Sequence, residues 1–179
     1  EMILPFEIGP KWAFTGGPHA AWSSADAWAA IDFAPPSAEN GCQLSNEWVV
    51  ASMPGLIVRS GDGAVVIDQD GDGYEQTGWT LLYLHIETRD RVPLGTWVEV
   101  GDRIGHPSCE GGRATGTHVH MARRYNGEWV PADGPLPFTL SGYVARAGTE
   151  AYQGWLIRES EIIYANTAST FETHISRDN

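Results

Sequence analysis

The sequence predicts a mainly β protein of one domain, and three observations carry this prediction. Glycine and proline are frequent, at 21 and 11 residues, and they divide the chain into short segments. The apolar runs between them are rich in valine, isoleucine, tryptophan and tyrosine, which favour strands. The chain has 179 residues, 42% of them hydrophobic, which is enough for a single core. Many short strands between turns indicate a sheet, a sandwich or a barrel.

The expected strands follow one another along most of the chain. They are residues 48–58, 64–67, 79–86, 96–100, 117–122, 154–157 and 161–164. The alanine-rich segment 20–30 is the one stretch that favours a short helix. Residues 131–140 are proline-rich and are expected to connect a core to a smaller C-terminal β segment. Residues 166–179 are polar and are expected to fray.

The charge balance excludes some partners. Lys plus Arg number 11 and Asp plus Glu 23, which gives a net charge of −12, and Lys11 is the single lysine. This acidity disfavours nucleic acids and anionic membranes, which select basic surfaces. Apolar runs fall short of the roughly 18 residues of a membrane span. We therefore expect no nucleic-acid partner and no membrane span, and favour a monomer.

The two cysteines, Cys42 and Cys109, could form one disulfide or remain two free thiols. Abundant glycine and tryptophan with a single lysine give the chain an extracellular character, which favours the disulfide. Neither cysteine has a partner at the spacing of a cysteine metal site.

Two of the six histidines stand as His118 and His120 around Val119. On a strand, residues i and i+2 point to one face, so the two imidazoles would lie side by side while Val119 enters the core. Imidazole is a preferred zinc ligand and the usual acid or base near neutral pH. The alternative is two polar residues on a solvated sheet face.

Three further residues could join this pair. His85 ends a strong strand, where alternation places it on the same face as Tyr83. Asp32 lies opposite to its apolar neighbours, and His19 follows a Gly-Gly-Pro turn that could hold it at a loop end. Taken singly, His85 reads as a half-buried histidine and Asp32 as an exposed strand acid.

Taken together, these residues resemble the lysostaphin-type zinc endopeptidases, which are peptidoglycan hydrolases. The resemblance rests on His19 and Asp32 at a long spacing, then the distant His85, then Gly-Thr-His-Val-His at 116–120. Residues 101–105, Gly-Asp-Arg-Ile-Gly, match the family's approach to its last motif. The branch that the chain resembles most is the staphylolysin and β-lytic group, over roughly residues 10–130.

The resemblance implies a role for each residue. His19, Asp32 and His120 match the zinc ligands, and His85 and His118 match the metal-free catalytic histidines. A zinc-bound water would attack the scissile carbonyl, with one histidine as base and the other stabilising the oxyanion or protonating the leaving amine. Some relatives carry a tyrosine directly before the first catalytic histidine, where this chain has Leu84.

Residues of the substrate cleft are less closely matched. Tyr83 and, more weakly, Tyr143 are candidates for an oxyanion-stabilising tyrosine that contacts substrate. Asp102, Glu110 and Arg113 could shape the peptide subsites from flanking loops.

The resemblance also predicts the architecture. We expect an antiparallel sheet that forms a groove, with loops walling the cleft and zinc on its floor. Residues 1–179 would form one catalytic peptidase domain, with a core over about 10–134 and a small C-terminal β extension over about 135–179. The expected function is a secreted or extracytoplasmic zinc endopeptidase that cuts peptidoglycan cross-links or stems. Glycine-rich bonds would suit a narrow cleft.

A second metal candidate lies in Asp68-Gln69-Asp70-Gly71-Asp72-Gly73. Acids at positions 1, 3 and 5 with glycine at 6 follow the start of a calcium loop, but Trp79 stands where an EF-hand requires glutamate. The flanks favour strands rather than helices. Asp68, Asp70 and Asp72 could therefore hold Ca²⁺ in a hairpin loop, or form a solvated turn.

Two other functions compete with the peptidase. The first is a non-catalytic relative of the same fold that binds the cell wall or activates a hydrolase. Such relatives typically lose ligands, whereas all five residues are present here. The second is a calcium-stabilised carbohydrate-binding β domain, suggested by the abundant tryptophan and the Asp68–Asp72 loop. It leaves the histidines and Asp32 unexplained.

Overall fold

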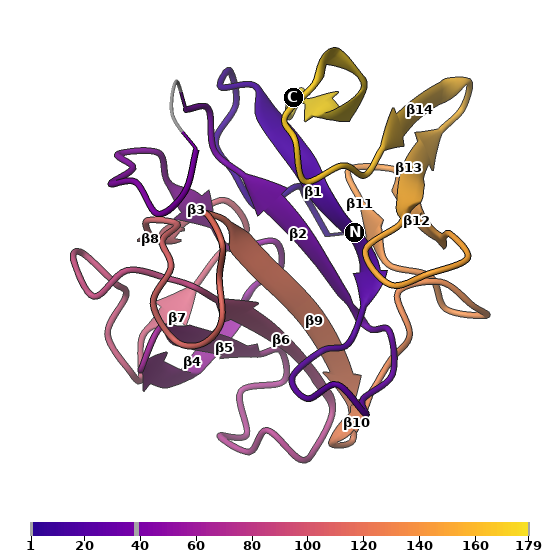
Figure 1. The fold of residues 1–179 in the computed structure, drawn as a ribbon. Coiled ribbons are helices and arrows are strands. Elements are labelled where there is room, and N and C mark those ends of the chain that lie inside the picture. Colours follow the sequence, from indigo (N-terminus) through magenta and orange to yellow (C-terminus); the bar gives the residue numbers. More distant parts are fainter. Residues whose placement is uncertain (1, 38–39, 179) are drawn as a thin grey trace.

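The computed structural model describes residues 2–37 and 40–178, and its main feature is a long antiparallel sheet (Figure 1). Its strands are β1 (Trp12–His19), β2 (Ala30–Ala34), β4 (Gly55–Gly61), β5 (Ala64–Asp68), β6 (Trp79–Leu84), β7 (Trp97–Val98), β9 (Val119–Tyr125), β10 (Glu128–Trp129) and β15 (His174–Ile175). Their order across the sheet is β15-β1-β2-β9-β6-β5-β4-β7, and β10 pairs with β9. The prediction of a mainly β, antiparallel fold is confirmed.

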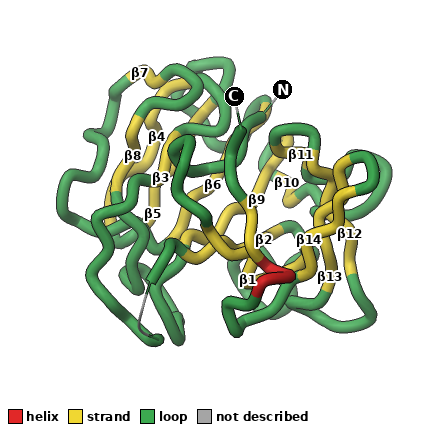
Figure 2. Tube along the Cα trace, turned by 90° about the horizontal axis from the view of Figure 1, so that it is seen from above, coloured by secondary structure: helices red, strands yellow, loops and turns green. Residues whose placement is uncertain are grey.

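Two smaller antiparallel sheets complete the described part of the chain. One has the order β11 (Thr139–Leu140), β12 (Tyr143–Ala147), β13 (Gly154–Arg158) and β14 (Glu161–Tyr164). It packs beside the β1 end of the main sheet (Figure 2) and shares the large core with it. The other pairs β3 (Val49–Val50) with β8 (Arg103–Gly105). Within the described residues, the one helical element is a 3₁₀ turn, η1 (Phe171–Thr173).

The C-terminal segment is joined to the core rather than appended to it. β15 pairs with β1 and forms the edge of the sheet, and the turn between β12 and β13 docks on the other end of β1. There the backbone N–H of Gly17 donates to the carbonyl of Tyr152, and the N–H of Tyr152 donates to the carbonyl of Pro18. The assignment of residues 1–179 to one catalytic domain stays a prediction.

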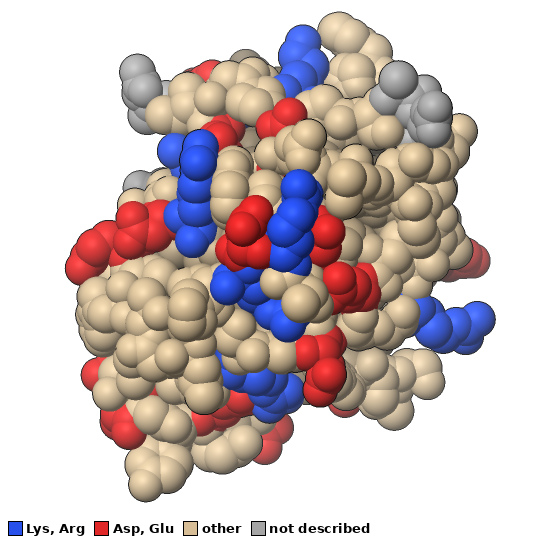
Figure 3. Space-filling view, turned by 90° about the vertical axis from the view of Figure 1, so that its left-hand side faces the viewer, with Lys and Arg blue, Asp and Glu red and all other residues tan. Residues whose placement is uncertain are grey.

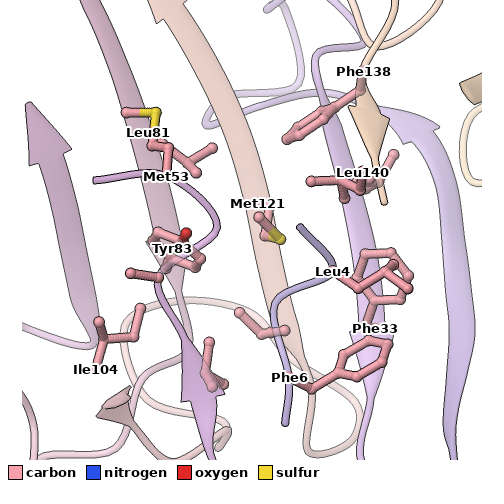
Figure 4. Close-up of a cluster of buried hydrophobic side chains, with 14 of the residues drawn as sticks. Leu4, Phe6, Phe33, Met53, Leu81, Tyr83, Ile104, Met121, Phe138 and Leu140 are labelled. Carbon is pink, nitrogen blue, oxygen red and sulfur yellow. The ribbon is translucent and has the colours of Figure 1, made fainter. Parts of the chain in front are cut away.

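Strand alternation gives the main sheet two different faces. On β6, Leu81 and Tyr83 enter the large core, while Leu82 packs in a small cluster on the opposite face. On β9, Val119 and Met121 enter the same core. Figure 4 shows Tyr83 and Met121 among its other members, which come from several strands and from the N-terminal segment. The opposite face carries smaller apolar clusters and has room between them for polar residues.

The prediction of a helix over residues 20–30 is wrong. This segment is an irregular loop up to the start of β2. The carboxylate of Asp26 accepts the backbone N–H groups of Trp22 and Ser23, which competes with helical hydrogen bonding. Ala21 and Ala29 are buried in a small cluster on the face of the sheet opposite the large core. The small size of alanine suits this packing, so the alanine content of the segment does not indicate a helix.

Cys42 and Cys109 form a disulfide, which agrees with the favoured reading of the sequence. The bond closes a separation of 67 residues and joins the loop after β2 to the loop before β9. In the loop-entropy model a crosslink of this length stabilises the folded chain by roughly 4 kcal/mol. The joined loops also contact each other through Thr117, whose N–H donates to the carbonyl of Gly41.

The charged side chains of the face shown in Figure 3 are interleaved. Lys and Arg lie among Asp and Glu there, and no broad basic area is visible. Ion pairs on the chain include Arg103 with Glu7 and Arg89 with Glu87. This mixture of charges agrees with the acidic composition. Within residues 2–37 and 40–178, no helix has the length and apolarity required to cross a membrane.

Candidate metal centre and active site

Strand pairing places Asp32 and His120 next to each other. In the β2–β9 register Asp32 lies opposite His120, and in the β6–β9 register Leu84 lies opposite His120. These residues therefore share the face of the sheet that points away from the large core. His19 is the last residue of β1, where it pairs with Ala30 of β2, and its side chain reaches the same point.

Backbone carbonyls fix the ring orientation of both histidines. Nδ1 of His19 lies 2.8 Å from the carbonyl of Gly17, and Nε2 of His120 lies 2.8 Å from the carbonyl of Ala21. A carbonyl can only accept, so these two ring nitrogens carry the protons. The other nitrogens, Nε2 of His19 and Nδ1 of His120, keep their lone pairs and face Asp32.

These three atoms have the spacing of metal ligands. Nδ1 of His120 lies 3.1 Å from Oδ1 of Asp32, Nε2 of His19 lies 3.4 Å from the same oxygen, and the two nitrogens are 3.1 Å apart. Tetrahedral zinc ligands at about 2.0–2.1 Å would lie about 3.3–3.4 Å from one another. Three lone pairs facing one another repel unless a cation lies between them. We call His19, Asp32 and His120 the metal triad.

The triad is buried and strongly polarised. His19 is 2% exposed, and Asp32 and His120 are each 7% exposed. Burial alone would raise the pKa of Asp32, but the adjacent imidazoles of His19 and His120 outweigh it and hold that pKa well below its usual range. Burial alone would lower the pKa of His19, yet the charge of Asp32 raises it. The carboxylate is thus ionised and suited to a cation.

Two more histidines face the triad. His85 and His118 have ring centroids 4.4 Å apart, and Nε2 of His118 lies 3.9 Å from Oδ2 of Asp32. Nδ1 of His85 donates to the carbonyl of Glu110 at 2.7 Å, and Nδ1 of His118 donates to that of Gly116 at 2.8 Å. Each therefore keeps a lone pair on Nε2. Burial and the neighbouring His118 lower the pKa of His85 to about 4.

The five residues singled out in the sequence therefore meet at one place, but two local expectations were wrong. His19 ends a strand and not a turn, because Gly16 and Gly17 lie within β1. His85 does not share a face with Tyr83. It follows β6 with a φ of 66°, and this left-handed conformation turns its side chain away from the alternation of the strand.

Neither predicted tyrosine reaches this site. Tyr83 is fully buried, and its hydroxyl accepts the backbone N–H of Ser52 on the core side of the sheet. Tyr143 is buried in the C-terminal sheet, where its hydroxyl donates to Glu161. The tyrosine beside the triad is Tyr152, whose ring stacks on His19 with centroids 4.1 Å apart. It comes from the β12–β13 turn, and no motif in the sequence marked it.

Glu110, Asp102 and Arg113, the residues expected to shape the peptide subsites, make three different kinds of contact. Glu110 orients His85 through its backbone carbonyl, while its carboxylate binds Thr88. The carboxylate of Asp102 accepts the N–H of Glu99 within its own turn. Arg113 lies close enough to Tyr152 to affect the pKa of its hydroxyl. Arg113 is thus the one of the three whose charge acts on the tyrosine that stacks on His19.

A hollow lies on the same face of the sheet as the triad. Leu82 of β6 and Val66 of β5 line its floor, and Trp22 and Trp129 line its sides. By the register of β6 and β9, Leu82 lies two residues from the position opposite His120. The hollow is about the size of one water molecule, and none of the five site residues lines it.

The comparison with protein families agrees with this geometry. The model of peptidase family M23 matches residues 28–132. This range includes Asp32, His85, His118 and His120 but begins after His19. The place of His19 in the triad therefore rests on the structure.

Named relatives and a solved structure extend the similarity. The β-lytic metalloendopeptidase of Achromobacter lyticus is 28% identical over 159 residues, which cover 84% of this chain but only 39% of that protein. The β-lytic metalloendopeptidase of Lysobacter enzymogenes is 25% identical over 153 residues, covering 84% of this chain and 82% of that protein. The structure of the M23 metalloprotease pseudoalterin matches 92% of this chain and 94% of its own, with a TM-score of 0.73 and 24% identity. This last match shows a shared fold.

Proposed function

The chain belongs to peptidase family M23, and from this premise we propose that it is a secreted zinc endopeptidase that hydrolyses peptide bonds of peptidoglycan. The observation that carries the proposal is the metal triad, whose three donor atoms lie 3.1–3.4 Å apart beside two further histidines. Three protein ligands leave a fourth position open, which is the pattern of a catalytic zinc site rather than a structural one.

The donor set fits zinc. Two neutral imidazoles and one carboxylate are ligands that zinc accepts, and the backbone carbonyls that hold His19 and His120 supply the orienting contacts of such sites. When bound by these residues, zinc supplies Lewis-acid polarisation of a carbonyl and of water.

His85 and His118 would carry the proton transfers. Each presents an Nε2 lone pair beside the triad because its Nδ1 proton is held by a backbone carbonyl. We assign one of them to accept the proton of the attacking water, and the other to stabilise the oxyanion or to protonate the leaving amine. A positioned base of this kind is typically worth 10²–10⁴-fold in rate.

The surroundings favour a peptide substrate outside the cytoplasm. The sheet face beside the triad carries two tryptophan side chains, Trp22 and Trp129, which would contact an extended chain. Tyr152 and Arg113 would contact the substrate from the other side of the triad. The Cys42–Cys109 disulfide supports an oxidising compartment. Glycine-rich bonds are the proposed targets, because residues without Cβ enter a narrow cleft most easily.

Zinc content and cleavage test this proposal together. We expect about one zinc per chain by elemental analysis, and chelator-sensitive cleavage of intact peptidoglycan or of a pentaglycine peptide. Zinc without cleavage of either substrate would favour the non-catalytic cell-wall-binding alternative. A chain that holds no zinc after incubation with the metal and removal of the excess would contradict the proposal.

A further inference from the structure

Three aspartates converge in the loop that joins β5 to β6. Asp68 ends β5, and Asp70 and Asp72 follow it in the loop. Each offers a carboxylate oxygen, and the three oxygens lie within 4.8 Å of one another. We call these three residues the acidic loop.

The acidic loop has no basic counterpart. Among residues 2–37 and 40–178, no Lys, Arg or His forms an ion pair with any of its three carboxylates. The nearby acid that does have basic partners is Glu75, which binds Arg59 and Arg124. Three like charges are thus gathered without a compensating charge, and Coulomb repulsion opposes this arrangement.

Asp68 supplies an independent sign of a missing ligand. Its side chain is fully buried, and its Oδ1 has no hydrogen-bond partner. Its Oδ2 accepts the backbone N–H of Gly73 at 2.9 Å, so this carboxyl group is half satisfied. A buried carboxylate oxygen without a partner is costly, and a coordinated cation is one of the few ways to offset that cost. Burial raises the pKa of Asp68, and the neighbouring Asp70 and Asp72 contribute to the shift.

The backbone of the loop is shaped around these carboxylates. Asp72 accepts the N–H of Tyr74 at 2.8 Å and the hydroxyl proton of Thr77, which fixes its orientation. A Cβ at Gly78 would lie 2.4 Å from Oδ2 of Asp70, so glycine at this position leaves space for the carboxylate where it stands.

From these observations we propose that the acidic loop binds one Ca²⁺ through Asp68, Asp70 and Asp72. An all-oxygen, anionic donor set selects a hard cation over zinc. Ca²⁺ takes 6–8 oxygens in flexible geometry, so loop carbonyls and water can complete the shell, whereas Mg²⁺ demands a near-ideal octahedron. The site lies apart from the metal triad: Asp68 pairs with Thr80 at one end of β6, and His120 pairs with Leu84 at the other. Its effect is therefore on stability.

Thermal unfolding of the zinc-loaded protein tests the proposal independently of peptidase activity. At a Ca²⁺ concentration about 100 times the Kd, the melting temperature should rise by about 5–10 °C, and Mg²⁺ at the same ionic strength should give much less. In calcium-free buffer, Asp70→Asn should melt at or above the wild-type temperature because it relieves repulsion, and it should lose most of the gain with Ca²⁺ because a neutral amide oxygen replaces an anionic ligand. The control is Asp62→Asn, an exposed turn aspartate whose φ of 48° asparagine also tolerates.

Terbium luminescence gives a second readout. The ring of Trp97 lies against Gly71, within 2.9 Å of where a Cβ would stand, so a Tb³⁺ ion in the loop would be sensitised by this indole. We expect emission that Ca²⁺ displaces, that Asp70→Asn strongly weakens at a limiting Tb³⁺ concentration, and that Asp62→Asn keeps. Absence of both the thermal shift and the emission would overturn the proposal. An equal thermal shift with Mg²⁺, or an equal loss in Asp62→Asn, would do the same.

Discussion

The metal triad and the acidic loop lie at opposite ends of β6, and they differ in how their donors are held. The triad takes its donors from paired strands, and hydrogen bonds to backbone carbonyls orient both of its histidines. The acidic loop takes one donor from a strand and two from exposed loop positions. The first site is organised by the sheet, and the second is a cluster of like charges that a cation would order. Loss of metal should therefore abolish activity at the first and lower stability at the second.

The largest expected effect separates the two sites directly. His120→Ala should abolish zinc binding and reduce cleavage of peptidoglycan to background, because it removes one of three ligands. Asp70→Asn should keep both zinc and cleavage at the wild-type level. Zinc content and turnover are measured on both variants in the same buffer. Full cleavage by His120→Ala would remove this residue from the ligand set.

The next largest effect distinguishes the metal ligands of the triad from the two adjacent histidines, His85 and His118. His85→Ala and His118→Ala should each lower kcat by about 10²–10⁴-fold while about one zinc per chain remains bound. The reason is that their Nε2 atoms face the site without belonging to the three close donor atoms. Zinc content and single-turnover cleavage are the measurements. If either variant loses zinc, that residue belongs to the ligands instead.

The sequence predicted the contents of the site better than its surroundings. Asp32, His118 and His120 follow from alternation, because strand periodicity alone decides their face. His85 departs from alternation because its φ is positive, and a histidine in the sequence gives no sign of this conformation. The prediction that Tyr83 and His85 share a face was therefore wrong.

The contacts of β1 could not be predicted from the sequence for a different reason. Gly16-Gly17-Pro18 resembles a turn, but these small residues admit distant parts of the chain. A Cβ at Gly17 would lie 2.5 Å from the carbonyl oxygen of Gln153. The same docking brings Tyr152 to His19. Packing between segments this far apart in the chain leaves no local periodicity, and it overrode the local turn signal.

The smallest of these effects tests how rigidly the sheet holds the triad. Gly16 pairs with Asp32 across β1 and β2, and a Cβ there would lie 2.5 Å from Oδ2 of Asp32. Gly16→Ala should push this carboxylate away from the histidine nitrogens and weaken zinc binding by about 10–100-fold, as loss of a supporting contact does in other metal sites. Competition with a chelator of known affinity measures the change.

Gly61→Ala is the matched control for this variant, because a Cβ at that position of β4 meets nothing within 4 Å. Both variants lose a glycine from a strand, so a general effect of that exchange on the fold would appear in both. If Gly16→Ala binds zinc as tightly as Gly61→Ala does, then Asp32 can shift without loss of the metal. The triad would then resemble the acidic loop in adapting to its ion, and the contrast between the two sites would lie in their ligand chemistry and not in their rigidity.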